Sequence, residues 1–234
     1  MKQDAVKDEF DAVSSHYGRS VDDALKFTGT SGSYFIKVKA NYLLDIANKH
    51  FNEISGLKVL DLGCGVGNFH SYLNHSFQHV CGADISDASI KLAKQFYKQS
   101  EFRVYDGQNL PYADQEFDIV FSSCVLHHVP LDNRERFAAN ASRVLKSGGI
   151  FAVFEHNTYN PLTRKVINDC AFDDDAIMLS VKELKALMDN QGFEEIKEKY
   201  ILTVPSFNLT TRKIDQALSG LRLGAQYYVT GTKV

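Results

Sequence analysis

The chain has 234 residues, of which 44% are hydrophobic and 24% are charged, and its formal net charge is −3. This length and apolar content suffice to bury one core without disulfides or metal ions, and the four cysteines show no metal-type pairing. Basic and acidic residues are interspersed, which excludes the basic surface of a nucleic-acid-binding protein and the polybasic stripe of a membrane-surface protein. We therefore expect a small-molecule partner and no metal site.

The N-terminal segment predicts a location and a helix. Residues 1–13 carry four acidic residues and no apolar run long enough for a signal peptide or a membrane-spanning helix. We therefore expect a cytoplasmic protein without membrane insertion. Residues 33–47 then place Phe35, Val38 and Tyr42 at helical spacing, which predicts a helix with one apolar face.

A glycine-rich turn follows the first predicted strand, residues 57–62. Gly63, Gly65 and Gly67 occupy alternate positions before a helical pattern begins. Glycines so spaced let the backbone approach a ligand closely and leave the N–H groups of the next helix facing it. A dinucleotide-binding turn would have its third glycine at position 68, where this chain has Asn68.

Residues 61–67, DLGCGVG, resemble motif I of the class I S-adenosylmethionine-dependent methyltransferases. The resemblance implies S-adenosylmethionine as the cofactor, with Gly63, Cys64, Gly65 and Gly67 beside it. It extends over residues 57–157, because three further signals follow in the order that the family has.

The second predicted strand, residues 80–85, ends in a carboxylate. Asp84 lies on the order of 20 residues after the glycines, where an acidic side chain accepts both hydroxyls of a ribose. Ile85 beside it belongs to the same predicted cofactor site, and Ser86 or Asp87 is expected to cap the following helix.

The third predicted strand, residues 102–106, ends in Asp106. The resemblance implies that this carboxylate accepts from the adenine amino group, with Gly107 and Gln108 at the edge of the adenine pocket. An aspartate followed by glycine is also an ordinary turn signal, so a turn remains the alternative.

The fourth strand, residues 117–124, and the fifth, which follows the turn at residues 146–149, complete the resemblance. Ser123 lies at the carboxyl end of the fourth strand and is predicted to contact the cofactor. His128 follows the fourth strand and His156 the fifth, and either is a candidate base for a hydroxyl acceptor. We rank His156 first because Glu155 and Asn157 flank it. The alternative is that these histidines are hydrogen-bonded structural groups.

The whole pattern predicts an α/β fold, a Rossmann-like doubly wound sheet of seven strands that is mostly parallel with an antiparallel last strand. Residues 51–234 form the methyltransferase domain, and residues 1–50 form a helical cap over the active site. Substrate-side insertions are expected near 158–180 and 206–224. In the second insertion, an apolar stripe predicts a short helix packed through Ile214, Ala217, Leu218 and Leu221.

The N-terminal sequence suggests where the methyl acceptor binds. Residues 10–17, FDAVSSHY, resemble the opening of many small-molecule methyltransferases, in which this segment lies over the active site. Gly18 departs from the family pattern, and an amphipathic helix is the alternative. Tyr17 and Tyr34 are predicted to contact the substrate, and Tyr34 or Lys37 to reach the methionine end of the cofactor.

The predicted reaction is methyl transfer to a small molecule, most simply to oxygen of a phenol, sugar, quinone precursor or lipid intermediate. Nucleic-acid amino methyltransferases carry an Asn or Asp, Pro, Pro, aromatic motif after the fourth strand, and residues 122–125 are SSCV instead. Two alternatives stay open. One is an NAD-dependent Rossmann oxidoreductase, and the other is a non-catalytic methyltransferase-like subunit that binds the cofactor. The sequence does not indicate the oligomeric state.

Overall fold

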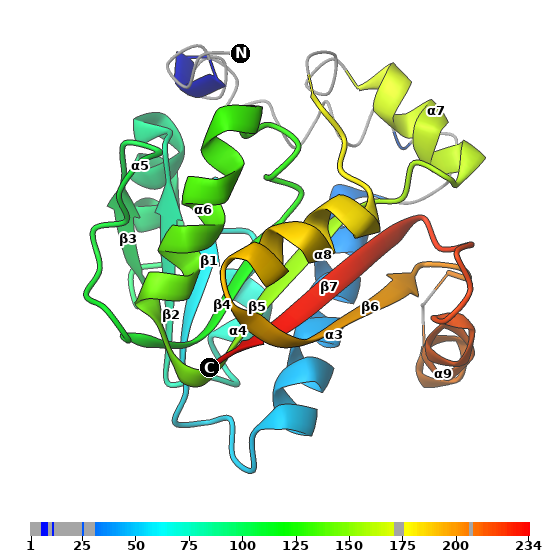
Figure 1. The fold of residues 1–234 in the computed structure, drawn as a ribbon, viewed down its shortest axis with the longest axis horizontal. Helices are drawn as coiled ribbons and strands as arrows, with labels where there is room; N and C mark the ends of the chain where they lie inside the picture. Colours follow the sequence, from blue (N-terminus) through cyan, green and yellow to red (C-terminus); the bar gives the residue numbers. More distant parts are fainter. Residues whose placement is uncertain (1–5, 9–10, 12–24, 26–30, 171–175, 206–207) are drawn as a thin grey trace.

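We describe the chain from a computed structural model, which defines residues 6–8, 11, 25, 31–170, 176–205 and 208–234. In these residues seven strands form one sheet in the order β3-β2-β1-β4-β5-β7-β6 (Figure 1). Of these seven strands, β7 runs in the direction opposite to the other six, so its pairings with β5 and β6 are antiparallel. The predicted fold class is therefore confirmed. The strands are β1 (Lys58–Leu62), β2 (His79–Asp84), β3 (Glu101–Val104), β4 (Phe117–Ser123), β5 (Leu145–His156), β6 (Phe193–Ile201) and β7 (Gln226–Lys233).

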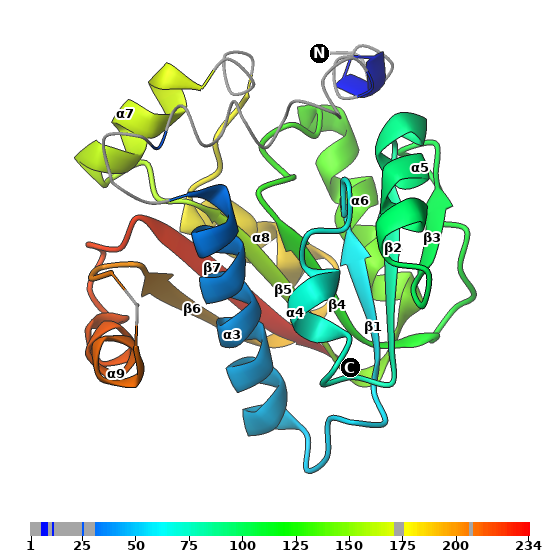
Figure 2. The ribbon, with the colours of Figure 1, turned by 180° about the vertical axis from the view of Figure 1, so that it is seen from behind.

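Helices cover both faces of the sheet. Figure 1 shows α6 and α8 in front of it, and Figure 2 shows α3 and α4 on the opposite face. α5 packs against β2 and β3 at one edge, and α7 lies beyond the edge at which the arrow of β1 ends. The helices are α3 (Gly32–His50), α4 (His70–Leu73), α5 (Asp87–Phe96), α6 (Leu131–Val144), α7 (Pro161–Asp169), α8 (Val181–Asn190) and α9 (Leu209–Leu218).

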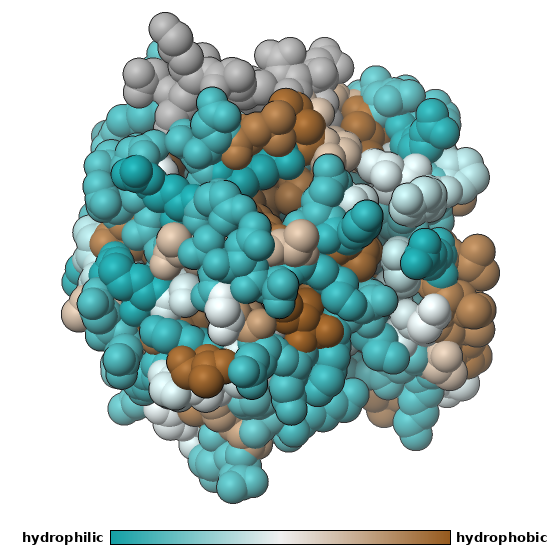
Figure 3. Space-filling model, in the orientation of Figure 1, coloured by the Kyte–Doolittle hydropathy of each residue, from teal (hydrophilic) through white to brown (hydrophobic). Residues whose placement is uncertain are grey.

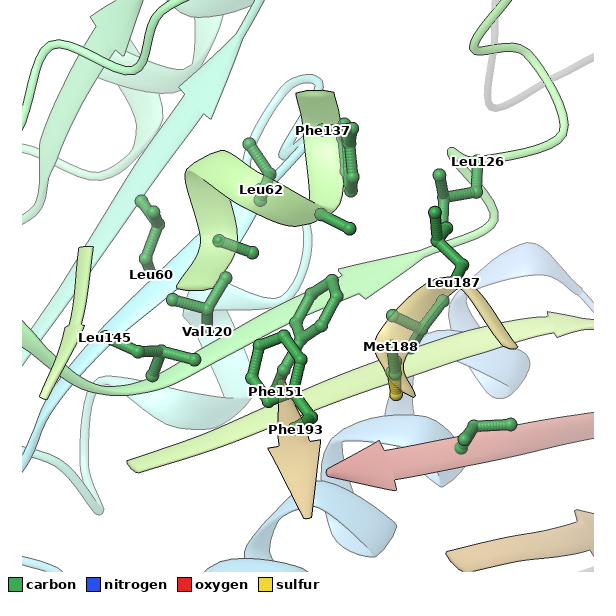
Figure 4. Packing of buried hydrophobic residues seen from close by; sticks show 14 of the residues in the cluster. Leu60, Leu62, Val120, Leu126, Phe137, Leu145, Phe151, Leu187, Met188 and Phe193 are labelled. Atoms are coloured by element: carbon green, nitrogen blue, oxygen red, sulfur yellow. The ribbon is translucent and has the colours of Figure 1, made fainter. Parts of the chain in front are cut away.

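The central strands are apolar on both faces because helices cover both. On one face, Leu62 and Val120 pack with Phe137 of α6, and Phe151 packs with Met188 of α8 (Figure 4). These side chains have at most 4% of their surface exposed. Burial of this extent fixes the strands and thereby the residues at their carboxyl ends, where ligands bind in such sheets.

α3 is part of the helical layer on the other face. Its side chains Tyr42 and Leu43 are buried, and they belong to one cluster with Val59 of β1 and Ile119 of β4. The predicted helix is therefore present. Residues 32–50 of the predicted cap cover the sheet itself, whereas most of residues 1–31 lie outside the described part of the chain.

The predicted helix in the second insertion is present as α9, but the prediction of its inward face was wrong. Ile214 is 47% exposed and Leu221 is 50% exposed, whereas Asp215 is fully buried. Exposed apolar side chains, including Leu209 and Leu223, therefore gather over α9 and the loop after it, at the right of Figure 3. The physical reason is that the Asp215 carboxylate accepts hydrogen bonds from the Tyr42 hydroxyl and from three backbone N–H groups.

The first insertion also contains a helix, α7, which the sequence analysis did not predict. The side chain of Asn160 accepts from the N–H groups of Leu162 and Thr163, and Pro161 occupies the first helical position. None of the helices in the described ranges is long and apolar enough to cross a membrane.

Candidate active site

The glycine turn between β1 and α4 has the backbone that its sequence predicts. Gly63, Gly65 and Gly67 have φ angles of 84°, 51° and 81°, a region that side chains disfavour. A Cβ on Gly63 would lie 2.4 Å from a methyl group of Val125, whereas a Cβ on Gly65 would meet nothing within 4 Å. The first glycine is thus required for packing, and the second borders open space at the carboxyl end of β1.

Asp84 joins this turn to the end of β2. Its Oδ2 accepts from the N–H of Gly65 over 2.7 Å, and its Oδ1 accepts from the N–H of Ser86 over 2.9 Å. Burial raises the pKa of the Asp84 carboxyl, although both N–H groups oppose this shift. The side chain is half-buried, as is Ile85 next to it. The sequence placed Asp84 at the site but did not predict that it also holds the turn.

A buried polar pair lies beneath the turn. Asp61 is 2% exposed and His70 is fully buried. The Asp61 Oδ2 and the His70 Nε2 lie 3.8 Å apart, and neither atom has a hydrogen-bond partner among the described residues. Burial raises the pKa of Asp61, an effect that the ammonium of Lys39 opposes. Buried atoms of this kind in folded proteins are usually satisfied by water or a ligand.

The residues predicted to border the adenine, 106–108, form a turn. Asp106 is exposed, and its Oδ1 accepts from the N–H groups of Gln108 and Asn109 over 2.8 and 2.7 Å. These bonds lower the pKa of the Asp106 carboxyl. Gly107 has a φ of 74° and, like Gln108, is half-buried. The turn alternative is therefore realised in the structure, and the contact of Asp106 with adenine stays a prediction.

Two further predicted cofactor residues differ in the direction of their side chains. Ser123, at the end of β4, has a buried hydroxyl without a hydrogen-bond partner. Cys64 instead packs its side chain into a core cluster with Ile90, Ala93 and Phe102. The side chain of Cys64 is therefore part of the core, and a contact of this residue with the cofactor stays a prediction.

Three histidines meet where β4 and β5 end. His127 is 2% exposed, and its Nδ1 lies 2.6 Å from Oε2 of the buried Glu155. The ring centroids of His128 and His156 lie 4.2 and 5.3 Å from that of His127. Burial acts to raise the pKa of Glu155, but the three histidines outweigh it and lower that pKa. His127 is therefore buried and anchored by Glu155, whereas its sequence neighbour His128 is half-buried, as is His156.

A second polar cluster, which the sequence analysis missed, surrounds the residue after Ser123. Lys39 of α3 is 5% exposed and donates to the Cys124 sulfur over 3.4 Å, and Gln226 of β7 donates to the same sulfur over 3.7 Å. His156 interacts with this sulfur as well. Helical spacing marked position 39 as part of α3 but gave no sign that a lysine there would be buried.

The predicted acceptor contacts are placed only in part. Tyr34 is half-buried and packs edge-on against Phe35, with ring centroids 5.4 Å apart. Lys37 is exposed, so the cation that α3 brings to the site is Lys39 instead. Tyr17 lies outside the described residues.

Comparison with known proteins agrees with this geometry. Residues 60–153 match the family model described as a methyltransferase domain. The chain is 32% identical over 149 residues to an uncharacterized methyltransferase of Synechocystis, covering 61% of this chain and 69% of that protein. It is 32% identical over 98 residues to a malonyl-[acyl-carrier protein] O-methyltransferase of Pectobacterium atrosepticum, covering 42% of this chain and 38% of that one.

A solved structure from Thermotoga maritima, described as a SAM-dependent methyltransferase and possible histamine N-methyltransferase, shares the fold. It superposes with a TM-score of 0.64 and 24% identity, covering 86% of this chain and 89% of that one. The predicted cofactor is confirmed by these family matches, which do not support the NAD-dependent alternative. The chain belongs to the class I S-adenosylmethionine-dependent methyltransferases.

Proposed function

We propose that this methyltransferase acts on an oxygen of a small molecule and that His156 removes the proton of the attacking hydroxyl. The observation that carries the proposal is the position of His156. Its half-buried ring lies at the end of β5, against the Cys124 sulfur and the anchored ring of His127. A base fixed in this way needs little reorganisation when it accepts a proton. His128, whose ring centroid lies 4.2 Å from that of His127, is the second candidate.

The residues at the glycine turn fit the family cofactor. Open space beside Gly65 would allow the close approach of the cofactor, and the Asp84 carboxylate next to it would accept the ribose hydroxyls. The unpartnered Asp61 carboxylate oxygen and the Lys39 ammonium suit the amino and carboxylate groups of the methionine end. When bound, S-adenosylmethionine supplies a methyl group already activated by its sulfonium. The chain must chiefly hold and orient the acceptor, and such positioning can contribute roughly 7–11 kcal/mol to lowering the barrier.

Contacts of the N-terminal segment support its proposed role as a cap. The carboxylate of Asp11 accepts from the Ser86 hydroxyl over 2.5 Å and from the N–H of Ala88 over 3.1 Å. Lys7 forms an ion pair with Asp87. The segment is therefore held at the start of α5, two residues after Asp84, where it would cover a bound ribose and limit access of water to the pocket.

The acceptor atom can be tested with a cofactor that carries a ¹³C methyl group. The purified chain is incubated with this cofactor and matched pairs of compounds, in which a phenol or alcohol is compared with its amine counterpart. We expect a labelled O-methyl product, identified by the carbon chemical shift. Transfer only to nitrogen or carbon would contradict oxygen as the acceptor.

The roles of the histidines are tested on whichever acceptor is found. His156→Ala is expected to lower kcat by about 10²–10⁴-fold, the range for loss of a general base, with unchanged affinity for S-adenosylhomocysteine. His75→Ala is a matched control, because His75 is an exposed histidine outside the site. If His128→Ala has this effect and His156→Ala does not, the assignment moves to His128. Tight binding of S-adenosylhomocysteine without turnover on any acceptor would favour the non-catalytic subunit.

A further inference from the structure

Cys124 has surroundings unlike those of the other three cysteines. Cys64, Cys81 and Cys170 are buried among other side chains, with 8%, 2% and 7% of their surface exposed. Cys124 is half-buried and has a φ of 56°, a left-handed backbone that residues other than glycine seldom adopt. Such a conformation persists only where surrounding structure enforces it, and it is common at functional sites. Cys124 directly follows β4, which ends at Ser123.

Two buried donors face this sulfur from other elements. The Lys39 ammonium lies 3.4 Å away and the Gln226 amide nitrogen 3.7 Å away, and both side chains are 5% exposed. A buried ammonium is costly unless an anion or acceptor compensates it, so its position against the sulfur favours the thiolate. The carbonyl oxygen of the same Gln226 side chain is buried and has no hydrogen-bond partner. It leaves an acceptor beside the sulfur for a group that donates.

The charges around the sulfur act in the same direction as this geometry. Burial alone would raise the pKa of Cys124, but the Lys39 ammonium and the His156 ring outweigh it and lower the pKa to about 6. Glu155, on β5, opposes this effect, and Tyr227 on β7 also couples to the charge of the sulfur. By contrast, burial raises the pKa of Cys81 to about 11.

We propose that Cys124 is a modification site, a thiolate held by Lys39 and oxidised by small hydroperoxides. In this step the thiolate sulfur attacks one peroxide oxygen, and the O–O bond breaks. The sulfur is oxidised to sulfenic acid and the peroxide is reduced, and its second oxygen leaves as an alkoxide or hydroxide that takes a proton from water. The new S–O–H group would donate to the unpartnered carbonyl oxygen of Gln226, which stabilises the product. The reaction requires neither cofactor nor methyl acceptor, so its test does not depend on the proposed methyl transfer, although both involve Lys39 and His156.

The test measures sulfenic acid directly. The full chain, purified in reduced form, is treated with hydrogen peroxide in the presence of dimedone, and the adducts are mapped by peptide mass spectrometry. We expect the adduct on Cys124 to form at least about tenfold faster than on each of the other three cysteines. A pH series of alkylation by iodoacetamide should place the half-maximal rate at Cys124 near pH 6.

Lys39→Met removes the cation and should move that midpoint upward by about one pH unit or more. Lys37→Met is the matched control, because Lys37 is an exposed lysine on the same helix. Lys39→Arg keeps the charge and should keep the low midpoint. Circular dichroism verifies that each variant is folded. If Lys39→Met does not fold, the pH series of the wild type alone decides whether Cys124 is a thiolate of low pKa. Equal labelling of all four cysteines, or a wild-type midpoint at the ordinary thiol value of about 8.5, would overturn the proposal.

Discussion

The N–H of Gly65 donates a hydrogen bond to Oδ2 of Asp84 over 2.7 Å, which ties the glycine turn to the end of β2. The two residues are 19 positions apart in the sequence. They meet because β1 and β2 are parallel neighbours, with Leu62 in register with Ala83. The part of the site that approaches the cofactor and the part that binds its ribose are therefore one hydrogen-bonded unit.

Because of this bond, substitutions of Asp84 should affect both cofactor affinity and stability, and the two effects can be measured separately. Asp84→Asn loses the charge and keeps an acceptor oxygen for only one of the two N–H groups, those of Gly65 and Ser86. We therefore expect affinity for S-adenosylhomocysteine to fall about tenfold or more, with a smaller loss of stability than in the alanine variant. Hydrogen bonds to charged groups contribute about 1.5–3 kcal/mol, which corresponds to that factor. Asp84→Ala should also lower the melting temperature, because the N–H groups of Gly65 and Ser86 lose their acceptor. Calorimetry and thermal unfolding measure both, and unchanged affinity in Asp84→Asn would remove this carboxylate from the ribose site.

Two glycines allow backbone strain to be separated from ligand exclusion. Gly65 and Gly148 both have positive φ angles, of 51° and 77°, and neither has an atom within 4 Å of an added Cβ. Gly65→Val and Gly148→Val should therefore both destabilise the fold, by about 1–3 kcal/mol. Only Gly65→Val should abolish binding of S-adenosylhomocysteine, since its side chain enters the open space at the end of β1. If both variants bind equally well in calorimetry, the turn does not contact the cofactor.

The sequence was sufficient to predict the sheet and the cofactor end of the site for a physical reason. Residues at the carboxyl ends of parallel strands share one edge, so locating the strands also locates Asp84, Ser123 and His156. Side-chain direction does not follow from this rule. The sequence could not show that Cys64 points into the core or that His127 rather than His128 binds the buried Glu155.

Lys39 was missed for a related reason. Helical periodicity assigns polar residues to the solvent face, and the long side chain of a lysine is usually solvated. Here the partner that makes its burial tolerable, Cys124, is 85 positions away and comes close only when α3 packs across the sheet. Local sequence carries no signal for a polar contact of this range.

Acid should destabilise the fold through His70. Burial lowers the pKa of this histidine to about 3, against about 6.5 when unfolded, so the unfolded chain binds more protons between these values. The free energy of unfolding should therefore decrease as the pH falls from about 6.5 towards 3, by on the order of 3–5 kcal/mol in full for this group. The raised pKa of Asp61 contributes with the opposite sign, and Asp61 is present in all three proteins compared below.

His70→Phe removes this contribution and keeps an aromatic ring beside Phe102, whose centroid lies 4.5 Å from that of His70. Ser100→Ala is the control, because it removes the hydrogen-bond partner of His70 Nδ1 but leaves the buried imidazole. Urea unfolding of the three proteins at a series of pH values gives the free energy of unfolding of each as a function of pH. An identical pH dependence in His70→Phe and the wild type would show that another group governs acid unfolding.

Asp215 should be a stability residue rather than a site residue. Fully buried in α9, it accepts from the Tyr42 hydroxyl over 2.6 Å and from the N–H groups of Leu202, Thr203 and Val204 over 3.0, 2.7 and 3.3 Å. It thereby fastens α9 to α3 and to the chain after β6. Asp215→Ala leaves the buried Tyr42 hydroxyl and the N–H groups of three half-buried residues without their acceptor. A buried donor without a partner costs about 1–3 kcal/mol, so we expect a total loss of about 3 kcal/mol.

The matched control is Asp189→Ala, because Asp189 is an exposed aspartate on α8. It should change the free energy of unfolding by less than about 0.5 kcal/mol. At a temperature where Asp215→Ala remains folded, its affinity for S-adenosylhomocysteine should equal that of the wild type. The reason is that the described hydrogen bonds of Asp215 join α9 to α3 and to the chain after β6, and none of them reaches the glycine turn or Asp84. A variant with normal stability and weakened binding would reverse this assignment and make α9 part of the cofactor site.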